Sequence, residues 1–265
     1  MIINFQLKNP DQINPAGTSA NQHLSWYLLT DGDLWLNLGD RVFYEYSKES
    51  VAYLGGKNSP YNDYYIARFI EDFIDLFENI QEEIPEGFFE LTNDLRKFQS
   101  DANQWWDMRG IDDDKAFEDY ETLTSWIKLR TLSSKHLKGG PDISFFRRDE
   151  KMRILWNSDY VLENGINLWS SDGGRYDMNY FEFVEEVRQF GQDFFSKMEK
   201  QVEFALKKDW HDVEIDKQRL VEEHRMRKDD FHSALNYLVK NGANRTNWKE
   251  VGALLDKMKG DLERK

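Results

Sequence analysis

Apolar and polar residues alternate along the first fifty positions, a pattern typical of strands with one buried face. A first strand is marked by apolar residues at every second position, namely Ile3, Phe5 and Leu7. Three more short apolar runs follow, at 24–29, 34–38 and 42–46. The turn-forming dipeptides Asp31-Gly32 and Gly39-Asp40 separate these runs. The sequence therefore predicts an N-terminal antiparallel β-meander, with Gly32 in a tight turn at positive φ.

Helical spacing replaces this alternation after residue 60. Apolar residues recur three and four positions apart from Ile66 to Ile80, and Pro85 stops the pattern. A short helix is predicted around 88–98. Another is predicted from the acidic run at 112–114 to about Leu137, since acidic residues favour the positive end of a helix.

The second half of the chain predicts one more hairpin and then helices. Residues 143–156 read as two strands joined at Asp149-Glu150, 166–169 can add another strand, and Gly173-Gly174 reads as a turn. Two later helices begin with a capping pattern, formed by Asn179 with Glu182 and by Asn247 with Glu250. The predicted fold class is α+β: an N-terminal antiparallel meander packed against helices, a mid-chain hairpin and a helical C-terminal half.

Length leaves the domain organisation open, because 265 residues suit one large domain or two small ones. We expect an α+β region with an antiparallel sheet over 1–175 and a helical region over 176–265 packed on it. The two regions can equally form a single domain.

Composition and charge narrow the classes of function. The chain has no Cys, which excludes disulfides and thiolate chemistry. Its formal net charge of −14, without a basic patch, argues against nucleic-acid binding. No stretch has the composition of a membrane span or signal peptide, so we expect a cytoplasmic protein with no membrane contact. Apolar residues make up 40% of the chain and aromatic residues 15%, enough for a packed core.

Several short sequence motifs resemble those of an uncharacterised bacterial family of unknown function. They are Leu24-Ser25-Trp26-Tyr27-Leu28-Leu29-Thr30-Asp31-Gly32, Trp35-Leu36-Asn37-Leu38-Gly39, Tyr44-Glu45-Tyr46-Ser47 and Pro60-Tyr61-Asn62-Asp63-Tyr64-Tyr65-Ile66-Ala67-Arg68 with Glu71-Asp72. The likeness extends through Trp156, 181–198 and Asn247-Trp248, where members of the family carry Asp-Trp. The resemblance implies a bacterial origin and a shared fold, and it implies no activity.

The segment from Trp26 to Trp35 is the first candidate site. Two tryptophans flank a turn that carries Asp31 and Asp33, so this segment can form the rim of a ligand pocket. The alternative is structural: Asp31-Gly32 only makes the turn, and both indoles pack on the helices.

Two more groups of residues combine aromatic rings with charges. Tyr64 and Arg68 are expected on neighbouring turns of one helix with Glu71, where they can bind a ligand or form surface pairs. The second group has the composition of an interface anchor or of a packed core with an Asp–Arg bridge. It consists of Trp105, Trp106, Asp107 and Arg109.

No motif indicates a cofactor or a metal site, and the five histidines do not fall at ligand spacing. We therefore expect a non-catalytic binding or interaction protein whose partner is another protein. An immunity protein that neutralises a toxin is one example of such a module. The alternative is a hydrolase of unfamiliar type that uses clustered carboxylates such as Asp31, Asp33, Asp63 or Asp107. The sequence does not define the oligomeric state.

Overall fold

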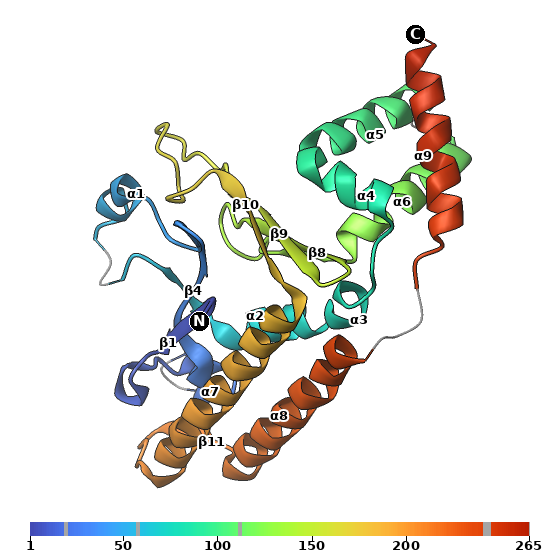
Figure 1. Ribbon diagram of the computed structural model, residues 1–265. Coiled ribbons are helices and arrows are strands. Elements are labelled where there is room, and N and C mark those ends of the chain that lie inside the picture. Colours follow the sequence, from blue (N-terminus) through green and yellow to red (C-terminus); the bar gives the residue numbers. More distant parts are fainter. Residues whose placement is uncertain (19–20, 57–58, 111–112, 241–244, 265) are drawn as a thin grey trace.

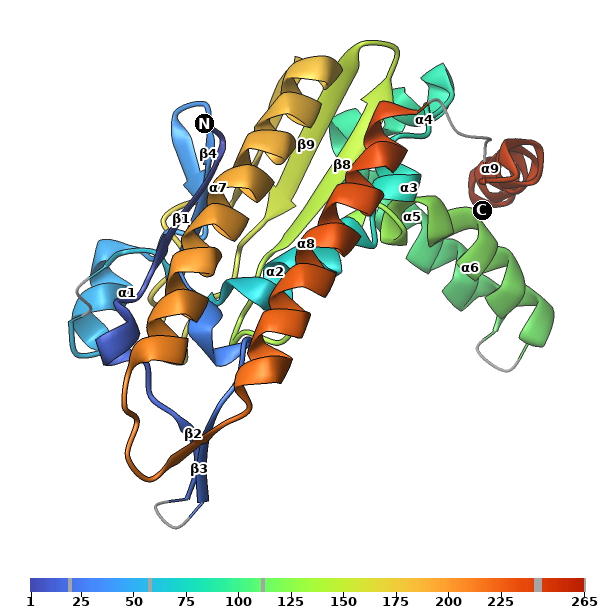
Figure 2. The same cartoon turned by 90° about the horizontal axis from the view of Figure 1, so that it is seen from below.

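The computed structural model describes residues 1–18, 21–56, 59–110, 113–240 and 245–264. It confirms the α+β fold class, with an N-terminal antiparallel sheet, a second antiparallel sheet in mid-chain and a helical C-terminal half (Figures 1 and 2). No helix in this described part of the chain is both long and apolar enough to cross a membrane.

The N-terminal sheet is built around one long strand, β4 (Asp31–Leu38). Its partners are β1 (Ile3–Leu7) on one side and both β5 (Arg41–Phe43) and β6 (Asn62–Tyr65) on the other. All three pairings are antiparallel. Along β4 every second residue is buried, so one face of the sheet contributes to the core and the other carries polar and aromatic side chains.

The predicted turn at Asp31-Gly32 is wrong, because both residues belong to β4. A 3₁₀ helix, η2 (Leu28–Thr30), interrupts the apolar run at 24–29 instead. The Thr30 hydroxyl stabilises this turn by donating to the Tyr27 carbonyl at 2.7 Å and accepting from the Ala67 amide at 3.2 Å. Gly32 is not at positive φ.

A third, smaller sheet lies beside the first and joins distant parts of the chain. Its strands are β2 (Ala16–Thr18), β3 (Asn21–Leu24) and β11 (Val213–Ile215), the last parallel to β3. A 3₁₀ helix, η1 (Pro10–Gln12), and a short helix, α1 (Lys48–Tyr53), lie in the connections of the N-terminal region.

The mid-chain sheet contains the predicted hairpin and two strands that the pattern did not indicate. Its strands are β7 (Thr131–Ser133), β8 (Asp142–Arg148), β9 (Lys151–Asn157) and β10 (Gly173–Asn179). The hairpin turn at Asp149 is confirmed, with φ of 51°. Gly173-Gly174 opens β10 instead of forming a turn. Residues 166–169 make only isolated bridges, because they lie in the loop that leads to β10.

The helices follow the predicted periodicity, with different limits. They are α2 (Ile66–Ile74), α3 (Phe77–Ile80), α4 (Glu86–Leu91), α5 (Leu95–Arg109), α6 (Asp114–Lys128), α7 (Tyr180–Lys207), α8 (Lys217–Val239) and α9 (Trp248–Glu263), with a 3₁₀ turn, η3 (Thr92–Asp94), before α5. The helix predicted over 66–80 breaks where Leu76 N donates to Phe73 O in a tighter turn. α6 stops at Lys128 because β7 follows, and both predicted asparagine caps are confirmed.

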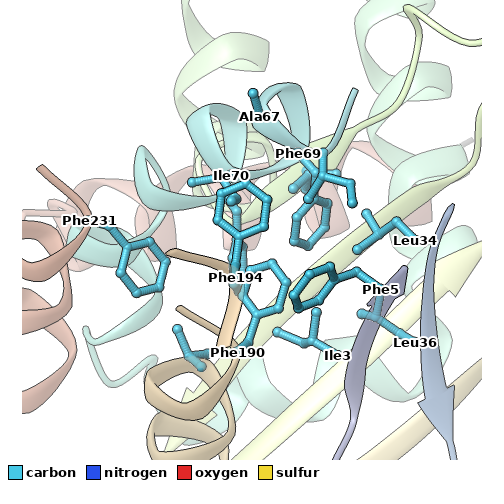
Figure 3. Packing of buried hydrophobic residues seen from close by; sticks show 14 of the residues in the cluster. Ile3, Phe5, Leu34, Leu36, Ala67, Phe69, Ile70, Phe190, Phe194 and Phe231 are labelled. Carbon is cyan, nitrogen blue, oxygen red and sulfur yellow. The ribbon is translucent and has the colours of Figure 1, made fainter. Parts of the chain in front are cut away.

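The larger hydrophobic core lies between the sheets and the long hairpin of α7 and α8 (Figure 2). Phe5 of β1 contacts Phe190 and Phe194 of α7 edge-on, with ring centroids 5.6 Å apart in both cases (Figure 3). A Cβ on Gly191 would lie 2.0 Å from the Phe231 ring of α8. Glycine at this position therefore lets the two helices approach closely.

The smaller core lies among α4, α5, α6 and α9, set apart from the α7–α8 hairpin (Figure 1). Glu82, fully buried, stands between the two cores and pairs with the buried Arg130 at 2.6 Å. Its carboxylate also accepts from the Thr246 hydroxyl at 2.8 Å and from Trp248 Nε1 at 2.9 Å. This network attaches the start of α9 to the centre of the molecule.

Candidate binding groove

An open groove of about 1420 Å³ lies between the N-terminal sheet, η1 and the last turns of α7. The residues that give it its chemistry are Gln6, Asp33, Tyr61, Asp63, Lys197 and Lys200. One wall is formed by strands and the other by a helix, so the groove brings together segments almost 200 positions apart in the sequence. No sequence pattern indicated this meeting.

The strand-side wall owes its two carboxylates to the register of β4 and β6. Asp33 and Asp63 are directly opposite each other in this antiparallel pair. Directly opposite residues have Cβ atoms about 4.5–5.5 Å apart and on the same face of the sheet. Both carboxylates also take part in interactions within the chain. The groove therefore presents two neighbouring acidic side chains, each of which also interacts with other residues of the chain.

An aromatic stack continues this polar face along the same two strands. Trp35, two positions beyond Asp33, lies parallel to Tyr61, with ring centroids 4.1 Å apart and an interplanar angle of 10°. Tyr61 lines the groove, and the Trp35 ring stacks on the ring of Tyr61. The predicted role of Trp35 in packing on helices is therefore replaced by a role in stacking on a groove residue.

Three lysines that line the groove have different surroundings. Lys8 pairs with Asp31 at 2.8 Å, which fixes Asp31 at the end of the strand-side wall. Lys197 lies 4.3 Å above the Phe5 ring, and Lys200 is exposed on α7. Lys197 and Lys200 give the helix-side wall basic groups, Asp33 and Asp63 give the β4–β6 wall acidic groups, and Lys8 and Asp11 line the groove as well.

Tyr64 and Arg68 lie next to this site but not in it. Tyr64 belongs to β6, so the predicted placement of Tyr64 and Arg68 on one helix is wrong: α2 begins only at Ile66. Tyr64 contacts the His136 ring at 5.1 Å, and Arg68 pairs with Asp72 at 2.9 Å in an exposed i,i+4 bridge. These contacts agree with the structural alternative for this pair.

A half-buried phenol near Tyr64, that of Tyr27, further limits the chemistry of this region. Burial, reinforced by the nearby Tyr64 and Glu71, raises the pKa of Tyr27 to about 12. The ring of Tyr27 packs 4.9 Å from that of Tyr65. The Tyr27 phenol therefore stays protonated at neutral pH, where it can donate a hydrogen bond and cannot act as a base.

Trp26 is a core residue and not part of a pocket rim. Its indole is 1% exposed and contacts Phe194, and its Nε1 donates to His224 Nδ1 at 3.3 Å. The Arg227 guanidinium lies 4.7 Å above the ring and pairs with Glu71. The alternative in which Trp26 packs on helices describes its position correctly.

The group at 105–109 lies in the smaller core, away from the groove. Trp105 is fully buried and donates to Asp261 of α9 at 3.0 Å. Arg109 pairs with Asp119 at 2.7 Å. Trp106 stacks on Tyr120, with ring centroids 5.0 Å apart, and Asp107 is exposed. Of the predicted carboxylates, Asp33 and Asp63 are directly opposite each other and Asp31 lies two positions from Asp33 on β4, whereas Asp107 lies on α5.

The geometry defines an α+β protein with an open groove, lined by acidic and basic side chains, beside its N-terminal sheet. The chain belongs to a family described as a family of unknown function (DUF5984), whose model matches residues 2–254. No curated protein and no solved structure matches the chain.

Proposed function

We propose that the protein is a non-catalytic binding protein that holds a segment of another protein in this groove. The observation that carries the proposal is the strand-side wall, where Asp33 and Asp63 lie opposite each other beside the Tyr61–Trp35 stack. Tyrosine and tryptophan are enriched in protein-binding sites, where they act as anchors.

The size of the groove favours a macromolecular ligand. Small-molecule sites usually have volumes of about 300–1,000 Å³ and enclose most of the ligand. The groove, at about 1420 Å³, is larger and is open to solvent. An extended polypeptide segment fills such a space better than a single metabolite does.

The charges favour a segment with a basic group toward the sheet. The formal net charge of −14 attracts cationic partners over long distances. Within the groove, Asp33 and Asp63 lie on the strand side and Lys197 and Lys200 on the helix side, whereas Lys8 and Asp11 are paired with Asp31 and Lys208. A segment with both signs of charge can pair with both walls.

The resemblance to a bacterial family supports a bacterial, cytoplasmic setting for this binding, and the absence of cysteine agrees with it. An immunity-like role, in which the partner is a toxin, is the specific form of the proposal. It would require the partner segment to be part of the toxin's active surface.

Selection of peptides by phage display on the purified protein tests the proposal. We expect enriched peptides to bind the wild-type protein and to bind Asp63→Lys at least about tenfold more weakly, because an exposed groove carboxylate is reversed in charge. Asp107→Lys is the matched control, since Asp107 is also exposed but lies on α5, outside the groove. Peptides that bind Asp63→Lys and Asp107→Lys as tightly as they bind the wild type would contradict the proposal.

The same two carboxylates favour a second candidate, a hydrolase. Neighbouring carboxylates can act as an acid and a base when their pKa values are pushed apart. A panel of fluorogenic esters and glycosides separates this candidate from binding. Turnover by the wild type that is lost in Asp33→Asn and kept in Asp107→Asn would favour the hydrolase.

A further inference from the structure

We infer that the strand-side wall recognises an arginine side chain of the partner segment, with the guanidinium between Asp33 and Asp63 and against Tyr61. This inference rests on the proposed binding function and deepens it. It names the chemical group that the wall selects.

The spacing of the two carboxylates suits a guanidinium better than an ammonium. Directly opposite positions of an antiparallel pair place the two Cβ atoms about 5 Å apart, so both carboxylates can face one ligand group. A guanidinium has five N–H donors in a flat fork and can donate to two carboxylates at once. An ammonium is a compact charge that gains less from a second, fixed acceptor.

The aromatic neighbour adds a second preference for arginine. Tyr61 lines the groove two positions from Asp63, and its stack on Trp35 holds the ring in one orientation. A planar guanidinium stacks on an aromatic face, and desolvation strengthens this contact. The wall therefore combines acidic acceptors with a preorganised ring.

The residues that the structure describes contain this recognition pattern three times with an indole as the ring. In each case, one guanidinium lies against an indole and pairs with a carboxylate. The three sets are Arg109 with Trp105 and Asp119, Arg130 with Trp248 and Glu82, and Arg227 with Trp26 and Glu71. The groove wall supplies the aromatic and acidic parts of the same pattern.

An incoming cation has to exchange with existing contacts, because Asp33 and Asp63 both interact within the chain. This exchange costs free energy for every incoming cation. A ligand group that contacts both carboxylates and the ring regains more of this free energy than a ligand group that contacts only one carboxylate.

Fluorine NMR of the protein labelled with 5-fluorotryptophan tests the inference, since Trp35 stacks directly on Tyr61. The Trp35 signal is assigned by its loss in Trp35→Phe. We expect argininamide to shift this signal with an affinity at least about tenfold higher than that of lysinamide. Citrullinamide, which has the same shape without the charge, is expected to cause no shift.

Variants of the wall complete the test. Asp63→Asn, at an exposed position, and the double variant with Asp33→Asn are expected to abolish the preference for argininamide. Asp107→Asn is expected to keep it. Equal binding of lysinamide or citrullinamide, no shift with argininamide, or a preference that survives in Asp63→Asn would overturn the inference. Phage-selected peptides that still depend on Asp63 but contain no arginine would leave the binding proposal standing while the arginine inference fails.

Discussion

Gly32 occupies a position where the neighbouring strand leaves no room for a side chain. A Cβ on this residue would lie 2.4 Å from the Gln6 carbonyl oxygen and 2.9 Å from Leu7 Cα, both in the backbone of β1. We predict that Gly32→Ala lowers the free energy of unfolding by about 2 kcal/mol, because β1 has to move away from β4. Urea denaturation measures the change.

Gly87 provides the control for this substitution. A Cβ there would meet nothing within 4 Å, and the residue lies in α4. Gly87→Ala should be neutral or raise the free energy of unfolding by up to about 1 kcal/mol, since alanine favours a helix. Equal losses in both variants would show that close approach of β1 is not the cause.

His224 is held in its neutral form by its surroundings. Trp26 Nε1 can only donate, so Nδ1 of His224 is the acceptor and carries no proton. Burial is the main cause that lowers the pKa of His224 below its ordinary value of 6.5. Lys228 lowers the pKa further, and Glu199 opposes this change.

The lowered pKa of His224 predicts a loss of stability in mild acid. As the pH falls, His224 takes up a proton in the unfolded chain before it does so in the folded protein. The free energy of unfolding is therefore highest above about pH 6.5 and falls as the pH drops through the lowered pKa of His224 in the folded state. The pKa of His136 is also lowered, mainly by burial, and acts in the same direction. His224→Asn keeps an acceptor near Trp26 and removes the titration. We expect this variant to lose less stability than the wild type between about pH 7.5 and about pH 5.5, and an identical loss would exclude His224 as a contributor.

Glu82 joins elements that are far apart in the sequence. It lies after α3, pairs with Arg130 after α6 and accepts hydrogen bonds from Thr246 and Trp248 at the start of α9. We predict that Glu82→Gln lowers the free energy of unfolding by about 3–5 kcal/mol, because Arg130 is left buried without a counter-charge. Thermal and urea unfolding measure the loss.

The Arg68–Asp72 bridge on α2 is the comparison for Glu82. It is exposed and follows the i,i+4 spacing. Arg68→Ala should therefore change the free energy of unfolding by no more than about 0.5 kcal/mol. Similar losses of the free energy of unfolding in Glu82→Gln and Arg68→Ala would mean that burial does not determine how much the Glu82–Arg130 pair contributes to stability.

The elements that the sequence predicted are those decided by local patterns. The alternation of β1, the hairpin at Asp149 and the asparagine caps of α7 and α9 depend on neighbouring residues alone. The wrong turn at Gly32 has a long-range cause. A glycine that avoids the backbone of β1 and a glycine that makes a turn look the same in the sequence.

The candidate site was predictable only in part, for the same physical reason. Asp33 and Asp63 could be named as carboxylates, but their meeting depends on the register of two strands separated by β5 and α1. The lysines of α7 join them only through tertiary packing. Trp105 and Trp26 could not be told from surface anchors, because composition does not reveal which side of a helix or turn is buried.

At the scale of the whole molecule, the groove and the smaller core occupy different regions. The groove depends on the N-terminal sheet and α7, which belong to the larger core. The smaller core contains α9 and has its own tryptophans, Trp105 and Trp126. A change in the smaller core can therefore affect stability without touching the groove, and the exposed Asp107 is suitable as a control for the groove variants.

The two cores also predict two regions of hydrogen exchange. Leu255 of α9 and Leu235 of α8 are matched residues, 8% and 7% exposed, in the smaller and larger cores respectively. Replacement of either by alanine should cost about 2–5 kcal/mol locally, through lost burial and a cavity. We predict that Leu255→Ala increases exchange mainly in α5, α6 and α9, whereas Leu235→Ala increases it in α7, α8 and α3, because local opening follows contiguous packing units. Hydrogen-exchange mass spectrometry distinguishes these patterns. The same uniform increase in both variants would show that the Glu82 network couples the cores into one cooperative unit.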